Sequence, residues 1–210
     1  MIKVLIADDH PIVRQGLQQI LKETVDIAVA GEAGNGAEAL KAVMENEVDV
    51  ALLDIAMPGR NGLEVLREVK QIKPEVRVLI LSTYPEEQYA VRAIKDGAAG
   101  YLTKESAPDE LINAIHKVAR GGKYVSAALA EKLAFYLEKD NEASLHETLS
   151  DREYQVMCLL ASGKTVKEIG AELALSVKTV STYRARILEK MQMKNNAALT
   201  FYAVKQGLVG

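Results

Sequence analysis

The sequence of 210 residues contains a single cysteine, Cys158. An intramolecular disulfide is therefore excluded, and a reducing, intracellular setting is expected. The sequence also lacks any apolar stretch of the roughly 18 residues that a membrane-spanning helix needs. Its first residues, MIKVLIADD, hold a short apolar run that ends in two carboxylates, which does not fit a signal peptide. We therefore expect a cytoplasmic protein with no membrane partner.

Charge is distributed unevenly along the chain. Residues 1–149 contain 17 Lys+Arg and 24 Asp+Glu, a net charge of −7, whereas residues 150–210 contain 9 and 5, a net charge of +4. The length fits two modest domains, and a composition that is 49% hydrophobic and 26% charged predicts packed cores. The basic tail indicates an anionic partner such as nucleic acid. The plainer alternative is that the basic residues only form solvated helix faces.

Short apolar runs alternate with helical patterns over the first 120 residues. The apolar runs cover 2–7, 27–33, 48–54, 76–82 and 99–103. The helical patterns lie near 12–23, 36–46, 62–73, 86–96 and 107–120. This alternation predicts βαβ units and an α/β domain with a doubly wound, five-stranded parallel sheet.

The rest of the chain has only helical patterns. Leucines at four-residue spacing predict a helix over 126–138, and the polar segment 139–147 (KDNEASLHE) is typical of a linker. Further helices are expected near 151–162, 166–174, 177–192 and 196–206. Their short connections predict a small all-α unit, in which the second and third helices form a helix-turn-helix pair.

Acidic, hydroxyl and basic residues follow the predicted strands at the edge where ligands bind in such sheets. Asp8 and Asp9 follow the first strand, Asp54 ends the third, Ser82 ends the fourth and Lys104 follows the fifth. Clustered carboxylates repel one another unless a divalent cation joins them, and hard oxygen ligands suit Mg²⁺. A metal ion and a lysine beside a carboxylate favour phosphoryl transfer, with Asp54 as the nucleophile. Each residue taken alone is more typical of an ordinary turn or surface position.

These residues lie in motifs that resemble the receiver domain of bacterial response regulators. The motifs are Asp8-Asp9, DIAMPGRNG at 54–62, LILST at 79–83 and GYLTK at 100–104. The resemblance covers residues 1–120 and implies that Asp54 accepts a phosphoryl group from a phosphohistidine of a sensor histidine kinase. It also implies that Asp9, Asp54 and the backbone carbonyl of Ala56 bind Mg²⁺, with Asp8 acting largely through water.

The same resemblance implies a conformational switch. Ser82 would be the switch hydroxyl and Tyr101 the switch aromatic residue. The sequence departs from the commonest receiver pattern at Glu105, which follows Lys104 where a proline often stands. A cis bond before a residue other than proline costs about 3–4 kcal/mol, so the backbone geometry is open at this point.

The segment 177–192 has two different faces on a helical wheel. One face carries Val177, Val180, Ile187, Leu188 and Met191, and the other carries Lys178, Ser181, Thr182, Ala185, Arg186 and Glu189. Small residues between two cations allow a helix to approach base edges in the major groove. At the flanks, where phosphates would lie, are Thr179, Lys190 and Lys194. A helical bundle with a solvated polar face explains the same wheel.

The tail also resembles the LuxR-type helix-turn-helix of NarL/FixJ response regulators. The motifs are LSDRE at 149–153, KEIG at 167–170, SVKTV at 176–180 and LEKM at 188–191. The resemblance implies that bases and phosphates are faced by Lys178, Thr179, Ser181, Thr182, Ala185 and Arg186. Arg184 departs from the family, because it lies on the inner side where a β-branched apolar residue is usual, and a contact with a phosphate suits its long side chain.

The motifs together predict a phosphorylation-controlled transcription regulator that is not an enzyme. We expect a flavodoxin-like receiver at 1–121, a helix and linker at 122–148, and a helix-turn-helix domain at 149–210. The expected partners are a sensor histidine kinase, double-stranded DNA and, after phosphorylation, a second copy of the chain; RNA polymerase is a further candidate. An aspartyl-phosphate phosphohydrolase is a rival that the LuxR-like tail disfavours. A constitutive DNA-binding protein with a degenerate receiver is a rival that the intact cluster disfavours.

Overall fold

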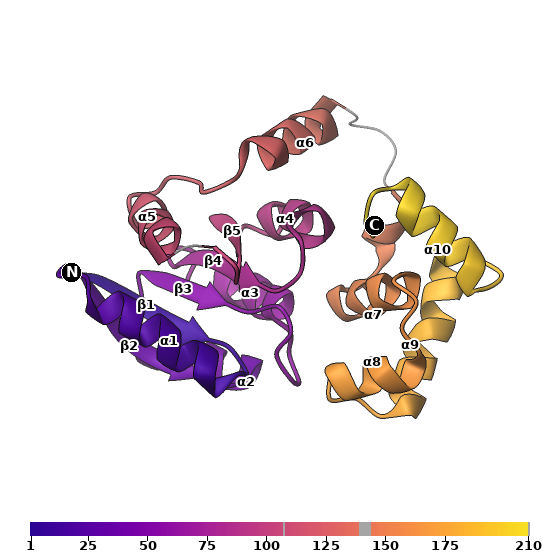
Figure 1. Ribbon diagram of the computed structural model, residues 1–210, viewed down its shortest axis with the longest axis horizontal. Coiled ribbons are helices and arrows are strands. Elements are labelled where there is room, and N and C mark those ends of the chain that lie inside the picture. The colour runs from indigo at the N-terminus through magenta and orange to yellow at the C-terminus, as the bar shows by residue number, and fades with distance from the viewer. Residues whose placement is uncertain (107, 139–143, 210) are drawn as a thin grey trace. The chain divides into compact units, whose positions relative to one another are not determined.

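The computed structural model describes residues 1–106, 108–138 and 144–209, which divide into two compact units, Met1–Leu133 and Ala134–Gly210 (Figure 1). The first unit contains a five-stranded parallel sheet in the order β2-β1-β3-β4-β5. Its strands are β1 (Ile2–Ala7), β2 (Ile27–Ala33), β3 (Val50–Leu53), β4 (Arg77–Ser82) and β5 (Gly100–Thr103). The predicted doubly wound sheet is confirmed, with strand ends shifted by no more than two residues.

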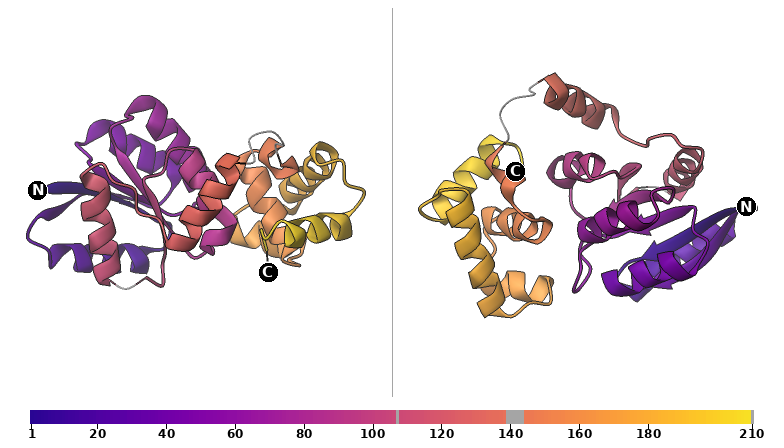
Figure 2. Two further views of the ribbon diagram at one scale, coloured as in Figure 1. Left: turned by 90° about the horizontal axis from the view of Figure 1, so that it is seen from above. Right: turned by 180° about the vertical axis from the view of Figure 1, so that it is seen from behind.

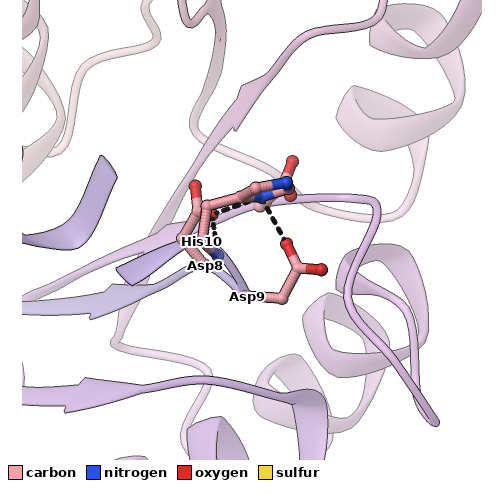
Figure 3. Close-up of side chains that lie close together, drawn as sticks. Asp8, Asp9 and His10 are labelled. Atoms are coloured by element: carbon pink, nitrogen blue, oxygen red, sulfur yellow. Dashed lines mark hydrogen bonds and ion pairs between the residues drawn. The ribbon is translucent and has the colours of Figure 1, made fainter. Parts of the chain in front are cut away.

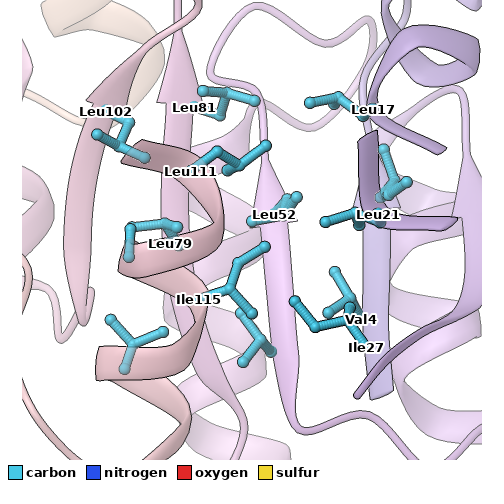
Figure 4. Packing of buried hydrophobic residues seen from close by; sticks show 14 of the residues in the cluster. Val4, Leu17, Leu21, Ile27, Leu52, Leu79, Leu81, Leu102, Leu111 and Ile115 are labelled. Atoms are coloured by element: carbon cyan, nitrogen blue, oxygen red, sulfur yellow. The ribbon is translucent and has the colours of Figure 1, made fainter. Parts of the chain in front are cut away.

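Helices cover both faces of the sheet. They are α1 (Pro11–Lys22), α2 (Gly36–Glu45), α3 (Gly62–Ile72), α4 (Glu86–Lys95) and α5 (Pro108–Ala119). The helices α1 and α5 lie on one face, and α2, α3 and α4 lie on the other (Figure 2). On the α1–α5 face, Leu21 and Ile115 pack with Leu52 and Leu79 of the central strands in one buried cluster (Figure 4). β3 is buried at every position, which explains its unbroken apolar run, since both faces of a parallel sheet are covered.

The loop from β3 to α3 is held tightly around the end of the strand. Asn61 is fully buried and caps α3 through a reciprocal pair of hydrogen bonds with Glu64. The next residue is Gly62, where an added Cβ would lie 2.1 Å from the carbonyl oxygen of Asp54. Only glycine fits at this position, and the close approach fixes the backbone that carries Asp54.

Beyond β5, the structure settles one point that the sequence left undecided and adds one that it did not predict. No cis peptide bond occurs among the described residues, so the bond between Lys104 and Glu105 is trans. Tyr124 forms a parallel bridge to Gly100 and continues the sheet beside β5. The chain then enters α6 (Ala127–Glu138), which matches the helix predicted over 126–138.

The second unit is entirely helical, as predicted. It comprises the 3₁₀ turn η1 (Leu145–Thr148) and the helices α7 (Asp151–Ala161), α8 (Val166–Glu172), α9 (Val177–Lys190) and α10 (Asn196–Lys205). Ser150 and Thr165 form the predicted capping boxes with Glu153 and Glu168. The turn η1 corrects the prediction of an aperiodic linker over 139–147, of which residues 139–143 lie outside the described residues. The Nδ1 atom of His146 lies 2.9 Å from the hydroxyl oxygen of Tyr202, which ties η1 to α10.

The helix-turn-helix pair depends on a small residue at the turn. An added Cβ at Gly170 would lie 2.8 Å from the carbonyl oxygen of Leu175, and Ala174 adopts a positive φ of 53° to complete the turn. The backbone of the turn before α9 therefore packs directly against Gly170 of α8, and a side chain at position 170 would not fit. Among the described residues, no helix has the length and apolar character that crossing a bilayer requires.

Candidate functional site

The carboxyl edge of the sheet brings together three residues that the sequence placed on separate strands. Asp8 and Asp54 are almost fully buried, at 1% and 2% exposure. The Nζ atom of Lys104 lies 2.6 Å from Oδ2 of Asp8 and 3.1 Å from Oδ2 of Asp54. The loops after β1, β3 and β5 thus build one pocket in which a single ammonium group faces two carboxylates.

Asp9 and His10 lie beside Asp8 at the edge of this pocket (Figure 3). The Nδ1 atom of His10 lies 2.7 Å from Oδ1 of Asp9 and 3.3 Å from Oδ1 of Asp8. Ligand atoms of Asp8, Asp9, His10 and Asp54 all lie within 4.8 Å of one another. His10 is not among the residues predicted from the sequence, although its position directly after the two aspartates was the available signal.

The electrostatics of the pocket favour an additional cation. Burial raises the pKa of Asp54, and the charge of Asp8 raises it further, while Lys104 and the backbone N–H of Ala56 oppose the rise. Burial lowers the pKa of Lys104, but the two carboxylates outweigh it and hold the ammonium in its charged form. A buried pocket with three carboxylates and one lysine carries excess negative charge, and its oxygen donors fit Mg²⁺. The donor set therefore suits the metal that the sequence predicted.

The two predicted switch residues lie next to this pocket and are linked through one loop. Ser82 is fully buried at the end of β4, and its Oγ atom accepts a hydrogen bond of 3.3 Å from the backbone N–H of Tyr84. Tyr101 is also buried, and its hydroxyl group donates a hydrogen bond of 2.8 Å to the carbonyl oxygen of Tyr84. Both side chains thus hold the backbone of the same residue, Ser82 at its N–H and Tyr101 at its carbonyl oxygen.

α9 presents the polar surface that the helical wheel predicted. Its exposed side chains include Lys178, Ser181, Thr182, Ala185 and Arg186, while Thr179 is half-buried. A shallow hollow in this surface is lined by Lys178, Thr179, Thr182, Tyr183 and Arg186. Ser176 caps the helix at its N-terminus by accepting a hydrogen bond from the backbone N–H of Thr179. On the inner side, Val180, Ile187 and Met191 are buried, but Val177 is 49% exposed, so its predicted inward position is wrong.

Two basic residues near the inner side of α9 have partners inside the second unit. The Nζ atom of Lys190 lies 2.6 Å from Oε2 of Glu153, a residue of α7 that is almost fully buried. The Nε atom of Arg184 donates a hydrogen bond of 2.7 Å to Oδ1 of Asn196 in α10. Arg184 therefore joins α9 to α10, which accounts for a cation at a position where an apolar residue was expected. Lys194 is exposed beyond the end of α9.

Two family models match this chain, one for each unit. The response regulator receiver domain matches residues 4–116, and the luxR family of bacterial regulatory proteins matches residues 147–203. The chain belongs to the NarL/FixJ family of response regulators. This family regulates transcription and is not a family of enzymes.

Relatives of this response regulator match it over nearly their whole length. It is 38% identical over 209 residues to the response regulator UvrY of Escherichia coli (strain K12), covering 99% of this chain and 96% of that protein. It is 37% identical over 210 residues to the response regulator GacA of Pseudomonas aeruginosa, covering 100% and 98%. Among solved structures, it resembles RcsB of Salmonella enterica serovar Typhimurium bound to promoter DNA in the presence of a phosphomimetic, with a TM-score of 0.60, 26% identity and coverage of 96% and 97%.

Proposed function

We propose that this response regulator receives a phosphoryl group on Asp54 from the phosphohistidine of a sensor histidine kinase, and that this phosphorylation controls DNA binding by α9. The proposal rests above all on the contact of one ammonium group, Lys104, with both Asp8 and Asp54 inside a buried pocket. A carboxylate nucleophile needs such a positive group beside it, because the oxygens of the incoming phosphoryl group are negatively charged.

The residues of the pocket have separate roles in the proposed transfer. Asp9, Asp54 and the backbone carbonyl of Ala56 would bind Mg²⁺, with Asp8 acting through water. When bound, Mg²⁺ supplies charge neutralisation at the phosphoryl oxygens. A carboxylate oxygen of Asp54 attacks phosphorus, an O–P bond forms, and the P–N bond to the kinase histidine breaks with its electron pair going to the imidazole. Lys104 neutralises one phosphoryl oxygen, and the Ser82 hydroxyl donates a hydrogen bond to another.

The transfer is tested with a small phosphoryl donor and Mg²⁺, followed by intact-protein mass spectrometry. The wild-type protein gains one phosphoryl group, and Asp54→Ala abolishes the gain. Asp9→Ala suppresses the gain at low Mg²⁺ concentration because a metal ligand is lost. Asp49→Ala is the matched control, since Asp49 is an exposed carboxylate before β3. Labelling that persists in Asp54→Ala assigns the nucleophile to another residue.

The DNA-binding role of α9 is supported by its exposed small and basic side chains and by the fold that it shares with a DNA-bound relative. In this proposal Lys178, Thr179, Ser181, Thr182, Ala185 and Arg186 face bases and nearby phosphates. Lys194 and Lys190 contact phosphates at the flanks. Because Lys190 already neutralises the buried Glu153, its removal disturbs the fold as well, so Lys194 is the cleaner test of a phosphate contact.

A binding titration on duplex DNA separates these two kinds of contact. Lys194→Ala weakens cognate and random DNA alike and flattens the salt dependence, since each neutralised phosphate contributes a log–log slope of about −0.9. Arg186→Ala weakens the cognate site more, by about 1–3 kcal/mol if a base contact is lost. Lys205→Ala removes an exposed cation near the end of α10 and serves as the charge control. If Arg186→Ala loses the same affinity for cognate and random DNA, the proposal that α9 reads the DNA sequence is wrong.

Dimerisation on phosphorylation is part of the same proposal. A protein that reads DNA with one short helix per chain gains affinity from a two-fold partner. α10 offers Phe201 and Val204, which are 72% and 56% exposed and lie one helical turn apart, as an apolar surface for a second copy. Sedimentation with and without beryllium fluoride tests this, and an unchanged mass at micromolar concentrations contradicts it.

The segments at 1–121, 122–148 and 149–210 are proposed as receiver, connector and DNA-binding domain. The family matches at 4–116 and 147–203 support this division, while the contact of His146 with Tyr202 indicates that η1 folds with the DNA-binding domain. The proposed site of action is the cytoplasm, because a bacterial transcription regulator must reach the chromosome. A sensor kinase and double-stranded DNA are the proposed partners, with RNA polymerase as a further candidate.

A further inference from the structure

The side chain of Arg14 reaches from α1 to the loop that carries the two adjacent aspartates of the pocket. Its Nη1 atom donates a hydrogen bond of 2.7 Å to the backbone carbonyl oxygen of Asp8. That carbonyl belongs to the peptide unit that joins Asp8 to Asp9, so the guanidinium group holds the backbone between them. The carboxyl group of Asp8 has partners of its own, the ammonium of Lys104 and the backbone N–H of His10.

A second element holds Arg14 in this position. Its Nε atom lies 3.4 Å from Oε2 of Glu32 in β2, and the side chain of Arg14 is only 19% exposed. Glu32 in turn accepts a hydrogen bond from the side-chain amide of Gln18, one turn further along α1. The planar guanidinium group is thus oriented before it meets the Asp8 carbonyl, and little conformational entropy is lost in that contact. One buried cation therefore connects α1, β2 and the loop after β1.

The directions of two pocket carboxylates depend on the peptide unit that Arg14 holds. Asp8 and Asp9 extend from the two sides of this unit, as their places on the loop in Figure 3 show. The Asp8 side is fixed by Lys104 at 2.6 Å, so a rotation of the peptide unit moves Asp9, a proposed ligand of Mg²⁺, relative to the rest of the pocket. Groups that orient metal ligands typically contribute about 10–100-fold to metal affinity.

We propose that Arg14 is a positioning residue for the Mg²⁺ site, because its bond to the Asp8 carbonyl fixes the peptide unit before Asp9 and keeps the Asp9 carboxylate directed at the metal. This inference rests on the proposed function, since it concerns the Mg²⁺ that the proposed phosphoryl transfer uses. Arg14 acts through the backbone that carries the ligand and contacts neither the metal nor the phosphoryl group.

Positioning and charge predict opposite effects when Arg14 is removed. The positive charge of Arg14 repels a nearby cation, although Glu32 neutralises part of it. If charge were its whole influence, Arg14→Met would bind Mg²⁺ more tightly than the wild type. If Arg14 positions Asp9, the same variant binds Mg²⁺ more weakly, by about tenfold. The direction of the change in Kd therefore decides between the two effects.

The experiment titrates Mg²⁺ into the full-length protein, follows the backbone amide signals of residues 8–10 by NMR, and measures Tm in EDTA and at one fixed Mg²⁺ concentration. Arg14→Met raises the Kd for Mg²⁺ about tenfold and reduces the rise in Tm that Mg²⁺ produces. Arg14→Lys keeps a positively charged donor at this position and restores part of the affinity. Arg60→Met is the matched control, because Arg60 follows Asp54 in the next loop and is likewise paired with a glutamate, Glu68, at 2.8 Å. This control does not weaken Mg²⁺ binding.

The outcomes separate the role of Arg14 from the proposed function. If Arg14→Met binds Mg²⁺ as tightly as the wild type or more tightly, the positioning role is wrong. A lower Tm in EDTA with an unchanged rise on adding Mg²⁺ shows a structural role alone and also overturns the proposal, as does Arg14→Lys binding as weakly as Arg14→Met. The proposed function fails by a different measurement, when the wild type binds Mg²⁺ but gains no mass from the phosphoryl donor.

Discussion

Asp54→Asn is expected to stabilise the metal-free protein. Two buried carboxylates share one ammonium group, and Lys104 lies closer to Asp8, at 2.6 Å, than to Asp54, at 3.1 Å. Burial raises the pKa of Asp54, so folding disfavours its ionised form at neutral pH. Asparagine has nearly the same shape and no charge. The substitution therefore removes the poorly compensated charge while the pair of Asp8 and Lys104 stays intact.

The size of the effect follows from the cost of a buried charge. Replacing a buried ion pair by neutral residues of similar volume often stabilises proteins by about 1–4 kcal/mol. Here only one carboxylate is removed and Lys104 keeps Asp8 as its partner, so no charge is left uncompensated and the expected gain is at the low end, about 1–2 kcal/mol. For a domain of this size this corresponds to a rise in Tm of about 4–8 °C. Mg²⁺ at one hundred times its Kd stabilises the wild type by about 2.7 kcal/mol. The order of the two stabilities therefore reverses when Mg²⁺ is added.

Thermal unfolding in EDTA and in excess Mg²⁺, followed by circular dichroism or calorimetry, measures this reversal. Asp54→Asn unfolds at the higher temperature in EDTA, and the wild type unfolds at the higher temperature in Mg²⁺. Asp109→Asn is the control, because Asp109 is exposed in the first turn of α5 and its substitution changes stability by about 0.5 kcal/mol or less. A lower Tm for Asp54→Asn in EDTA, or an equal gain from Mg²⁺ in both proteins, would refute the electrostatic reasoning.

Three further predictions concern stability elsewhere in the chain. Lys73→Met lowers the free energy of unfolding by about 1–2 kcal/mol in urea denaturation, because the Nζ atom of Lys73 donates to carbonyl groups at the end of α2, the nearest at 2.8 Å. Gly170→Ala lowers the Tm of the DNA-binding domain and its DNA affinity, since the new Cβ would lie 2.8 Å from the carbonyl oxygen of Leu175 and the turn must shift. Burial raises the pKa of Glu153, but hydrogen bonds, above all from Lys190, outweigh it and lower the pKa below its ordinary value of 4.5. This pair therefore stabilises the fold above that value and less as pH falls through the lowered pKa, so Glu153→Gln is less stable at pH 7 and loses less stability in acid.

Each of these predictions has a control and a result that contradicts it. Lys41→Met removes an exposed lysine of α2 and leaves the urea midpoint unchanged. If Lys41→Met and Lys73→Met shift the midpoint equally, the loss of a positive charge explains the effect and the hydrogen bonds of Lys73 do not. Ala171→Ser, at an exposed position of α8, keeps wild-type DNA affinity, and Gly170→Ala doing the same contradicts the steric argument. Glu189→Gln, exposed on α9, keeps the acid dependence of the wild type; an identical pH profile for Glu153→Gln excludes the ion pair as its source.

The sequence predicted the sheet and the location of its acidic pocket because both depend on periodicity. Fully apolar runs such as β3 identify strands that are covered on both faces, and parallel strands deliver their end residues to one edge. Asp8, Asp54 and Lys104 therefore met where the strand ends predicted. His10 was missed because it belongs to the loop after β1, where its side chain direction depends on the loop conformation and not on a repeating pattern.

In the helical unit, a helical wheel predicts burial less well, because it includes the residues of one helix and none of its neighbours. The wheel correctly assigned the buried Val180 and Ile187 but placed Val177 inside, whereas Val177 is 49% exposed in the first turn of α9. For Arg184 the sequence suggested a phosphate contact, whereas the partner in the structure is Asn196, which belongs to the next helix and is not visible on a wheel of α9 alone.

Local signals in this chain determined the strands, the helices, most caps and the membership of the pocket, since each depends on residues close in sequence or on strand order. The tertiary structure decided which charges are paired: Lys104 lies between Asp8 and Asp54, and Lys190 pairs with Glu153. These pairs join residues 37 to 96 positions apart. No short-range pattern encodes them, because the free energy of such a pair depends on burial and distance, which exist only after the elements have packed.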